Sequence, residues 1–339
     1  MSAMNLSSGM DVYINFSEAK NGSMTLKEFV PWMDVCLNLA FFILGSLGNG
    51  LVIYVLGFRM KKSGFLTYVL NLAVADFGFC ALLLLQIPVN LAKYHYMYGL
   101  AVCKMEQYLT RVFFYAGSLF IAAICLERCL AILHPIWHKC KRPARTTPLA
   151  CTLIWALSCF IALPNLIKSD IISFGKRGDR CFVNDINTII LISTSELVLI
   201  FLLPLAVILT CSAVIINKLR KRGKGQSQVN RTVCLVAFLF LLCWTPFQIG
   251  QYMHLIQMFF LKDDLQFQSV ASTMGYYCGF LLYLNSCLNP AIYVLMGRDI
   301  KQRVVNSLSS LMAIFEKAFS ESENSTMLSS LKTSSSTVH

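Results

Sequence analysis

Ionisable and amide side chains stand inside long apolar stretches of this chain, where their chemistry is to pair with one another. Asp76 lies mid-way along one such stretch, in Leu72–Asp76. A charge at membrane depth is costly unless a partner charge, a hydrogen bond or a bound ion compensates it. We expect Asp76 to sit in a polar cluster that holds a sodium ion or a proton, or that serves only as a hydrogen-bonded packing core. Its candidate partners are Asn49, Asn285, Ser286 and Asn289.

A second ionisable group is Glu127-Arg128-Cys129, which ends another apolar stretch just before a basic segment. One interpretation is an ordinary interfacial arginine, whose charged head reaches water. The other is an activation switch, in which Glu127 holds Arg128 until a neighbouring helix moves away. The position of the pair and the following His134–Trp137 favour the switch.

Two prolines interrupt apolar stretches that would otherwise form straight helices. Pro246 follows Trp244 by two residues, and Pro290 stands directly after Asn289 and three residues before Tyr293. A proline in a membrane helix frees a backbone carbonyl, which neighbouring polar groups can satisfy. Packing alone can also tolerate such prolines. Together they predict bends that take part in an activation switch.

No constellation typical of an enzyme, a transporter or a nucleic-acid-binding protein is present. The five histidines are scattered, and we find no metal-ligand spacing, nucleophile elbow or phosphate-binding loop. Transporters show internal repeats, and the sequence has none. Its basic residues fall in short connections between apolar stretches. We therefore expect neither catalysis nor nucleic-acid binding.

The composition is that of a protein with many membrane spans. The chain has 339 residues, of which 56% are hydrophobic and 14% charged, with a mean hydropathy of +0.62. An apolar helix needs about 20 residues to cross a bilayer. The sequence predicts an all-α bundle of seven transmembrane helices at about 33–58, 66–92, 103–133, 148–168, 187–217, 231–259 and 268–296.

The distribution of basic residues predicts the orientation. The first, third and fifth connections are basic and free of acids, which is typical of the cytoplasmic side. The net charge of +12 is mostly this inner charge, and it indicates contact with anionic membrane lipid. We expect a multi-pass plasma-membrane protein with an extracellular N-terminus. The glycosylation sequons Asn5, Asn15 and Asn21 agree with that orientation.

Four regions follow from these observations. Residues 1–32 are expected to form an extracellular glycosylated segment, and residues 33–296 the seven-helix domain. Residues 297–315 read as a short basic amphipathic helix at the membrane surface. Residues 316–339 are rich in Ser and Thr, a composition typical of a disordered cytoplasmic tail.

Two of the fourteen cysteines differ from the rest. Most of the others lie within apolar stretches and read as small buried hydrophobic residues. Cys103 opens the third predicted span, and Cys181 lies in the longest outer connection, so both meet oxidising surroundings. A disulfide between them would hold that connection across the mouth of the bundle.

Over residues 30–315 the chain resembles the rhodopsin-like family of G-protein-coupled receptors. Within that family it is most similar to chemoattractant receptors, especially the formyl-peptide type, and secondarily to Mas-related receptors. The matching elements are Gly48-Asn49, Leu72–Asp76, Cys103 with Cys181, Glu127-Arg128, Trp155, Pro204, Cys243–Pro246 and Asn289–Tyr293.

The resemblance implies how such a chain works. An extracellular chemotactic ligand, a peptide or an anionic lipid, would bind in the bundle mouth and activate a heterotrimeric G protein of the inhibitory class. Receptor kinases would modify the tail, which would then recruit arrestin. No cofactor is implied other than the sodium ion considered above. The alternatives are a Mas-related-type receptor for basic peptides or small ligands, and a decoy receptor that does not couple.

The expected ligand pocket departs from the formyl-peptide receptors in its charges. Those receptors carry an acid at the position of Arg111 and an arginine at that of Glu196. We expect Arg111 and Glu196 to pair across the cavity, either as a ligand contact that favours acidic ligands or as a purely structural ion pair. If the pair contacts ligand, Arg111→Ala should weaken agonist potency and leave surface expression intact. The other expected pocket residues are Gln86, Thr110, Phe114, Phe247, Gln248, Gln251, His254 and Tyr283.

Overall fold

The computed structural model describes residues 26–60, 63–175, 178–221, 228–261, 264–296 and residue 302. The predicted glycosylation sites Asn5, Asn15 and Asn21 lie outside the described residues. So do the cytoplasmic tail and, apart from residue 302, the predicted amphipathic helix.

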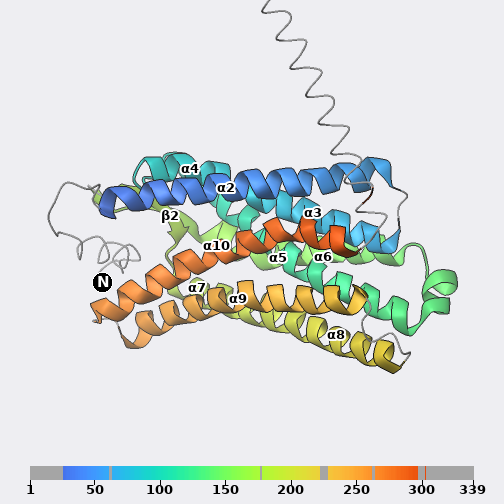
Figure 1. The fold of residues 1–339 in the computed structure, drawn as a ribbon. Coiled ribbons are helices and arrows are strands. Elements are labelled where there is room, and N and C mark those ends of the chain that lie inside the picture. Colours follow the sequence, from blue (N-terminus) through green and yellow to red (C-terminus); the bar gives the residue numbers. More distant parts are fainter. Residues whose placement is uncertain are drawn as a thin grey trace, which may run out of the picture.

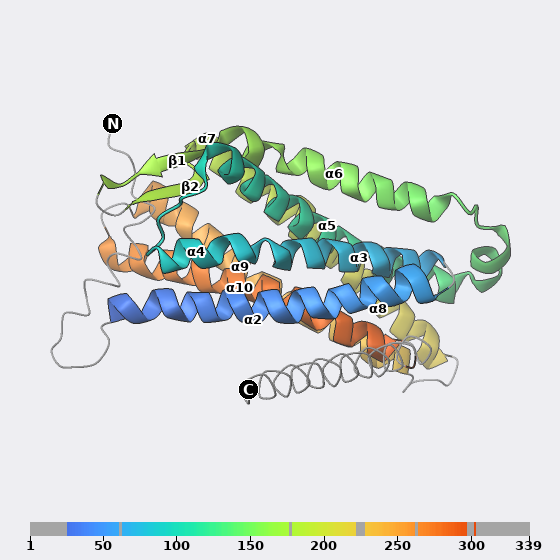
Figure 2. The same ribbon diagram turned by 90° about the horizontal axis from the view of Figure 1, so that it is seen from above.

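The described part of the chain folds as an antiparallel bundle of seven helical rods (Figures 1 and 2). Two rods are composite: α3 and α4 are separated by Leu82, and α7 and α8 are joined by a π-helical segment, Glu196–Leu202. Short π-helical segments, Val55–Arg59 and Trp137–Lys141, follow α2 and α5. The helices are α2 (Leu26–Tyr54), α3 (Gly64–Ala81), α4 (Leu83–Leu91), α5 (Gly99–Leu133), α6 (Thr146–Lys168), α7 (Ile186–Ser195), α8 (Leu203–Lys221), α9 (Gln228–Phe260) and α10 (Leu265–Met296).

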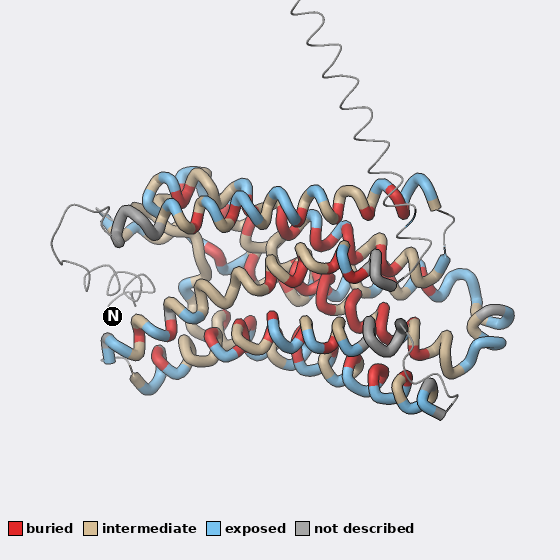
Figure 3. The backbone as a smooth tube through the Cα atoms, viewed as in Figure 1, coloured by how far each residue is buried: buried red, intermediate tan, exposed pale blue. Residues whose placement is uncertain are grey.

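Six of the rods are long and apolar enough to cross a membrane, which confirms the predicted all-α membrane bundle. The seventh, α10, has 32 residues and carries polar side chains inside the bundle. Asn285, Ser286 and Asn289 are all buried there. In Figure 3 the buried positions gather mainly in the middle of the bundle, and the exposed positions lie mainly on its outer sides and ends.

Several helices begin before the predicted spans. The largest difference is in α2, which begins at Leu26 although the predicted span begins at residue 33. Hydropathy marks the part of a helix that lies in hydrocarbon. Backbone hydrogen bonding can continue past that part into the interface, so apolarity alone underestimates the helix length.

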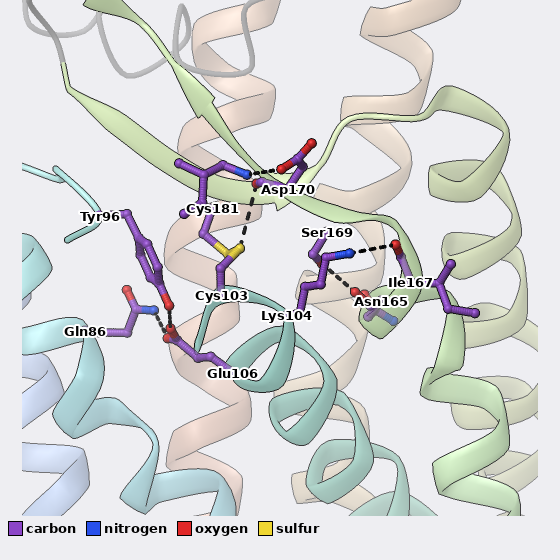
Figure 4. The surroundings of a disulfide bond; sticks show 11 residues. Gln86, Tyr96, Cys103, Lys104, Glu106, Asn165, Ile167, Ser169, Asp170 and Cys181 are labelled. Atoms are coloured by element: carbon purple, nitrogen blue, oxygen red, sulfur yellow. Dashed lines mark hydrogen bonds between the residues drawn. A yellow bond between two sulfur atoms is a disulfide. The ribbon is translucent and has the colours of Figure 1, made fainter. Parts of the chain in front are cut away.

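A two-stranded hairpin covers one end of the bundle, here called the disulfide end. Strands β1 (Ser169–Ser173) and β2 (Asp179–Val183) pair antiparallel, with Ile171 opposite Cys181. The Cys181–Cys103 disulfide ties β2 to the second turn of α5, as predicted (Figure 4). The loop before α5 is attached too, since the Tyr96 N–H donates to the Asp179 carbonyl at 2.7 Å. The hairpin is therefore held against α5 on two sides.

Pro204 explains the irregular fifth rod. It lies in the first turn of α8, directly after the π-helical segment, and a proline has no N–H to donate to the carbonyl of Ile200. Ser118 of α5 supplies the missing donor, because its hydroxyl donates to the Ile200 carbonyl at 2.6 Å. The irregular segment that begins with Glu196 is thus stabilised by a neighbouring helix.

Close helix packing at Gly250 gives a testable prediction. An alanine Cβ at Gly250 would lie 2.9 Å from the Gly275 Cα atom, so α9 and α10 would have to separate. We expect Gly250→Ala to lower the free energy of unfolding by about 1–3 kcal/mol, as overpacking does. Gly279→Ala is the control, because no heavy atom lies within 4 Å of its Cβ position. Thermal unfolding of the purified protein measures both, and equal midpoints would contradict the prediction.

Candidate functional site

A cavity of about 340 Å³ lies between α2, α4, α5 and α10. Its lining includes one basic side chain, Arg111, and one acidic side chain, Glu106. Both stand on α5. Glu106 comes three residues after Cys103, and Arg111 comes eight residues after it. The remaining lining residues are Asn38, Leu82, Leu83, Gln86, Gln107, Thr110, Tyr276, Gly279, Phe280 and Tyr283.

Arg111 and Glu196 pair as the sequence predicts. The Arg111 Nη1 atom donates to Glu196 Oε1 at 2.7 Å, and the Tyr115 hydroxyl donates to the same oxygen at 2.8 Å. The Arg111 side chain is 25% exposed, whereas that of Glu196 is 2% exposed. Of the two, only Arg111 lines the cavity. The pair therefore offers its cation to the cavity and buries its anion.

Glu106 is a cavity residue that the sequence reasoning missed. Its two carboxylate oxygens accept hydrogen bonds from the Gln86 amide and, at 2.8 Å, from the Tyr96 hydroxyl (Figure 4). Burial and the hydrogen bond to Glu106 raise the pKa of Tyr96 well above its usual range, so this phenol remains a donor. The signal was present, because an acid three residues after Cys103 falls inside an apolar span.

An aromatic stack connects the cavity to the proline bend of α9. Tyr283 lines the cavity and stacks on Phe79, with ring centroids 4.2 Å apart. Phe79 contacts Phe114 at 5.9 Å, and Phe114 stacks on Trp244 at 4.7 Å. Trp244 is followed by the helix-interior Pro246. A displacement of Tyr283 by a ligand has a continuous path of packed rings to that bend.

The other predicted pocket residues divide into two groups. Thr110, like Arg111 and Tyr283, lines the cavity. Phe114, Phe247 and Gln248 are instead buried in the packing between α5 and α9. Two half-buried residues of α9 also lie outside the lining, Gln251 and His254. On the α9 side, Phe114 stacks on Trp244, and the predicted pocket role of the α9 residues stays a prediction.

The polar residues expected around Asp76 are buried together on α2, α3 and α10. Asp76 Oδ2 accepts a hydrogen bond from the Asn289 amide at 2.7 Å. The Asn49 amide donates to the Ser286 carbonyl at 3.2 Å and to that of Gly45 at 2.9 Å. Asn285 is also buried on α10. The cluster joins three helices directly beside Pro290, whose ring contacts the Gly48 position of α2.

At the opposite end of the bundle, Glu127 has different partners from the one predicted. Arg142 Nη1 donates to both of its oxygens at 2.5 Å, and His138 Nε2 lies 2.9 Å from Oε1. Arg128 instead lies over the Phe65 ring, 3.4 Å from its centroid. In the described residues Glu127 thus binds the segment after α5 and not Arg128. That segment returns toward α5 through Arg142, which α6 also binds through Thr147.

Tyr293, the last predicted switch residue, lies within α10, which continues to Met296. Its side chain is outside the described part of the structure.

Comparison with known protein families identifies the family of this chain. A family model described as "7 transmembrane receptor (rhodopsin family)" matches residues 48–293, well over half of the chain. The chain belongs to the rhodopsin family of seven-transmembrane receptors. It is therefore a multi-pass membrane receptor, and this family is not enzymatic.

Within the rhodopsin family, the chain is similar to chemoattractant receptors. It is 32% identical over 346 residues to mouse "Formyl peptide receptor-related sequence 1", covering 94% of this chain and 97% of that one. It is 31% identical over 281 residues to the zebrafish "C3a anaphylatoxin chemotactic receptor", covering 83% and 75%. It is 28% identical over 331 residues to rat "Chemerin-like receptor 1", covering 89% and 87%. The chain is thus a rhodopsin-family receptor of the chemoattractant type.

In this rhodopsin-family receptor, the cavity and the Glu127 cluster occupy opposite ends of one bundle. The aromatic stack and the Asp76 cluster lie between them. Packed side chains thus run through the interior of the bundle between its two ends.

Proposed function

We propose that this receptor binds an extracellular chemotactic ligand with an anionic group, a peptide or a lipid, at the disulfide end and activates an inhibitory heterotrimeric G protein. The disulfide end then faces the outside of the plasma membrane, as does the N-terminus. The observation that carries the proposal is the Arg111–Glu196 pair, which turns only its cation toward the cavity.

The geometry of Arg111 supports an anionic ligand. A guanidinium group has five N–H donors, and Glu196 engages one of its terminal nitrogens, Nη1. Other donors remain for a carboxylate or phosphate, which arginine binds in a bidentate manner. Glu196 and Tyr115 hold the guanidinium in place before the ligand arrives. The cavity volume lies within the range of roughly 300–1,000 Å³ that is usual for ligand pockets.

The signal would pass along the aromatic stack to α9. A ligand that moves Tyr283 displaces Phe79 and Phe114, and with them Trp244 beside the bend at Pro246. Movement of α9 about that bend would open the opposite end to the G-protein alpha subunit, with Arg128 among its contacts. Receptor kinases and arrestin would then act on the Ser- and Thr-rich tail.

G-protein dissociation in cells that express this chain tests the proposal. The panel contains formylated peptides, other chemotactic peptides and anionic lipids, each with an uncharged analogue. We expect dissociation of an inhibitory G protein with an anionic ligand and a much weaker response to its uncharged analogue. Silence across the panel at good surface expression would contradict the proposal and favour a Mas-related-type or decoy receptor.

We further propose that the Asp76 cluster binds a sodium ion. Asp76 and the oxygens around it are hard ligands, and Asn49 Oδ1 is buried without a hydrogen-bond partner among the described residues. An ion that binds only the folded state stabilises that state. We expect the thermal unfolding midpoint of the purified receptor to be higher in sodium chloride than in potassium chloride of equal concentration. Asp76→Asn should remove the difference, and identical wild-type midpoints in both salts would refute sodium binding.

A further inference from the structure

The cavity is lined by a second ionisable side chain, Glu106, which has no ion-pair partner among the described residues. Glu106 is 4% exposed and accepts hydrogen bonds from two neutral donors, Gln86 and Tyr96. Within the described residues, the acids in ion pairs are Glu196 and Glu127. Lys104, the basic residue closest to Glu106 in sequence, directs its ammonium to the Ile167 carbonyl at 3.4 Å instead. Glu106 thus lines the cavity without an ion-pair partner in the part of the chain that the structure describes.

A buried carboxylate in this situation is suited to bind a cation. Its two oxygens together offer about four acceptor positions, and Gln86 and Tyr96 occupy one on each oxygen. These donors also fix its orientation, because Tyr96 is bound through its backbone to β2 and Gln86 stands on α4. A buried charge is stabilised strongly by an opposite charge in the same low-dielectric space. The free acceptor positions can meet a cationic group of a ligand.

We propose that Glu106 and Arg111 form a two-charge site for an amphoteric ligand, with its cationic group at Glu106 and its anionic group at Arg111. This rests on the proposed function, which supplies the anionic contact. The two residues are five positions apart on α5, an axial separation of about 7.5 Å. That separation matches about two residues of extended peptide. A peptide with a basic side chain close to its free C-terminal carboxylate fits the site.

The positions of the two charges also fix the direction of entry. Glu106 is three residues from Cys103, at the disulfide end, whereas Arg111 lies more than a turn further along α5. The anionic group of the ligand therefore enters first, and its cationic group stays nearer the mouth. A purely anionic lipid would place no cation at Glu106.

The test uses synthetic tetrapeptide pools and G-protein dissociation. One pool has a lysine next to or two positions before a free C-terminal carboxylate; a second has norleucine in its place; a third has the lysine and a C-terminal amide. The receptors are the wild type, Glu106→Gln, and Arg111→Gln with Glu196→Gln. Lys104→Gln is the matched control, since it removes a charge from the same helix without lining the cavity. Surface expression is measured for each.

We expect the wild type and Lys104→Gln to respond to the lysine pool at concentrations at least about tenfold lower than to either other pool. Glu106→Gln, which keeps the size of the side chain, should lose the lysine preference and keep the carboxylate preference. An inactive set of pools, an equal response to lysine and norleucine, or an unchanged Glu106→Gln would overturn the inference. A carboxylate preference without a lysine preference would refute the two-charge site alone. Loss of both preferences in the wild type would refute the proposed anionic contact as well.

Discussion

Arg111→Ala is expected to reduce surface expression and stability sharply, in contrast to what the sequence alone predicted. Glu196 is 1% exposed, and the truncation would leave its charge buried with the Tyr115 hydroxyl as its remaining bonded partner. Removing one member of a buried ion pair costs about 3–5 kcal/mol. That is a large part of the roughly 5–15 kcal/mol that stabilises a typical fold. Thermal unfolding of the purified receptor and cell-surface labelling measure the effect.

The paired variant Arg111→Gln with Glu196→Gln is the control. It removes both charges and leaves two side chains that can still hydrogen-bond, so we expect expression close to that of the wild type. The swapped variant, Arg111→Glu with Glu196→Arg, keeps an ion pair but turns the anion toward the cavity. A stable, well-expressed Arg111→Ala would show that the ion pair has no structural role.

Arg142→Ala is expected to lower the maximal agonist response about tenfold at matched surface expression, through Arg128. In the structure, Glu127 is 3% exposed and is bound by Arg142 and His138. Arg128 lies over the Phe65 ring instead. Without Arg142, the carboxylate loses its closest cation, and Arg128 is the next residue in the chain. A buried charged hydrogen bond is worth several kcal/mol, enough to draw Arg128 from its contact with Phe65. G-protein dissociation at saturating agonist is the measurement.

Two further variants test this explanation. Adding Glu127→Gln to Arg142→Ala removes the acid that would capture Arg128, and it should restore the response. Arg145→Ala removes an exposed charge from the same segment and should have little effect. A normal response from Arg142→Ala, or no recovery in the double variant, would exclude the proposed capture of Arg128.

Much of the fold was predictable from the sequence, because membrane helices must satisfy their own backbone hydrogen bonds. Apolar length alone therefore indicates each helix. The cost of a charge inside the membrane also pointed to Asp76 and to the Arg111–Glu196 pair, since a charged group inside a span needs a partner. The disulfide followed from one cysteine at the outer end of a span and another in the longest outer connection.

The parts that sequence reasoning missed depend on how side chains fill space. Phe114 and Trp244 stack between α5 and α9, outside the lining of the cavity. No pattern in the sequence indicates that these rings meet. Glu127 pairs with Arg142 because the segment after α5 turns back, which its basic composition does not reveal. Glu106 was overlooked because it sits near the end of a span, where an acid is less unusual.

The most direct test of the central claim compares dose–response curves for an anionic chemotactic ligand in the wild type and in the swapped Arg111→Glu, Glu196→Arg variant. Inhibitory G-protein dissociation is the readout, at matched surface expression. The account predicts a rightward shift of at least about 100-fold in the swapped variant, because the ligand would meet a like charge at the cavity. Superimposable curves would contradict it, since a ligand that ignores this reversal does not bind Arg111.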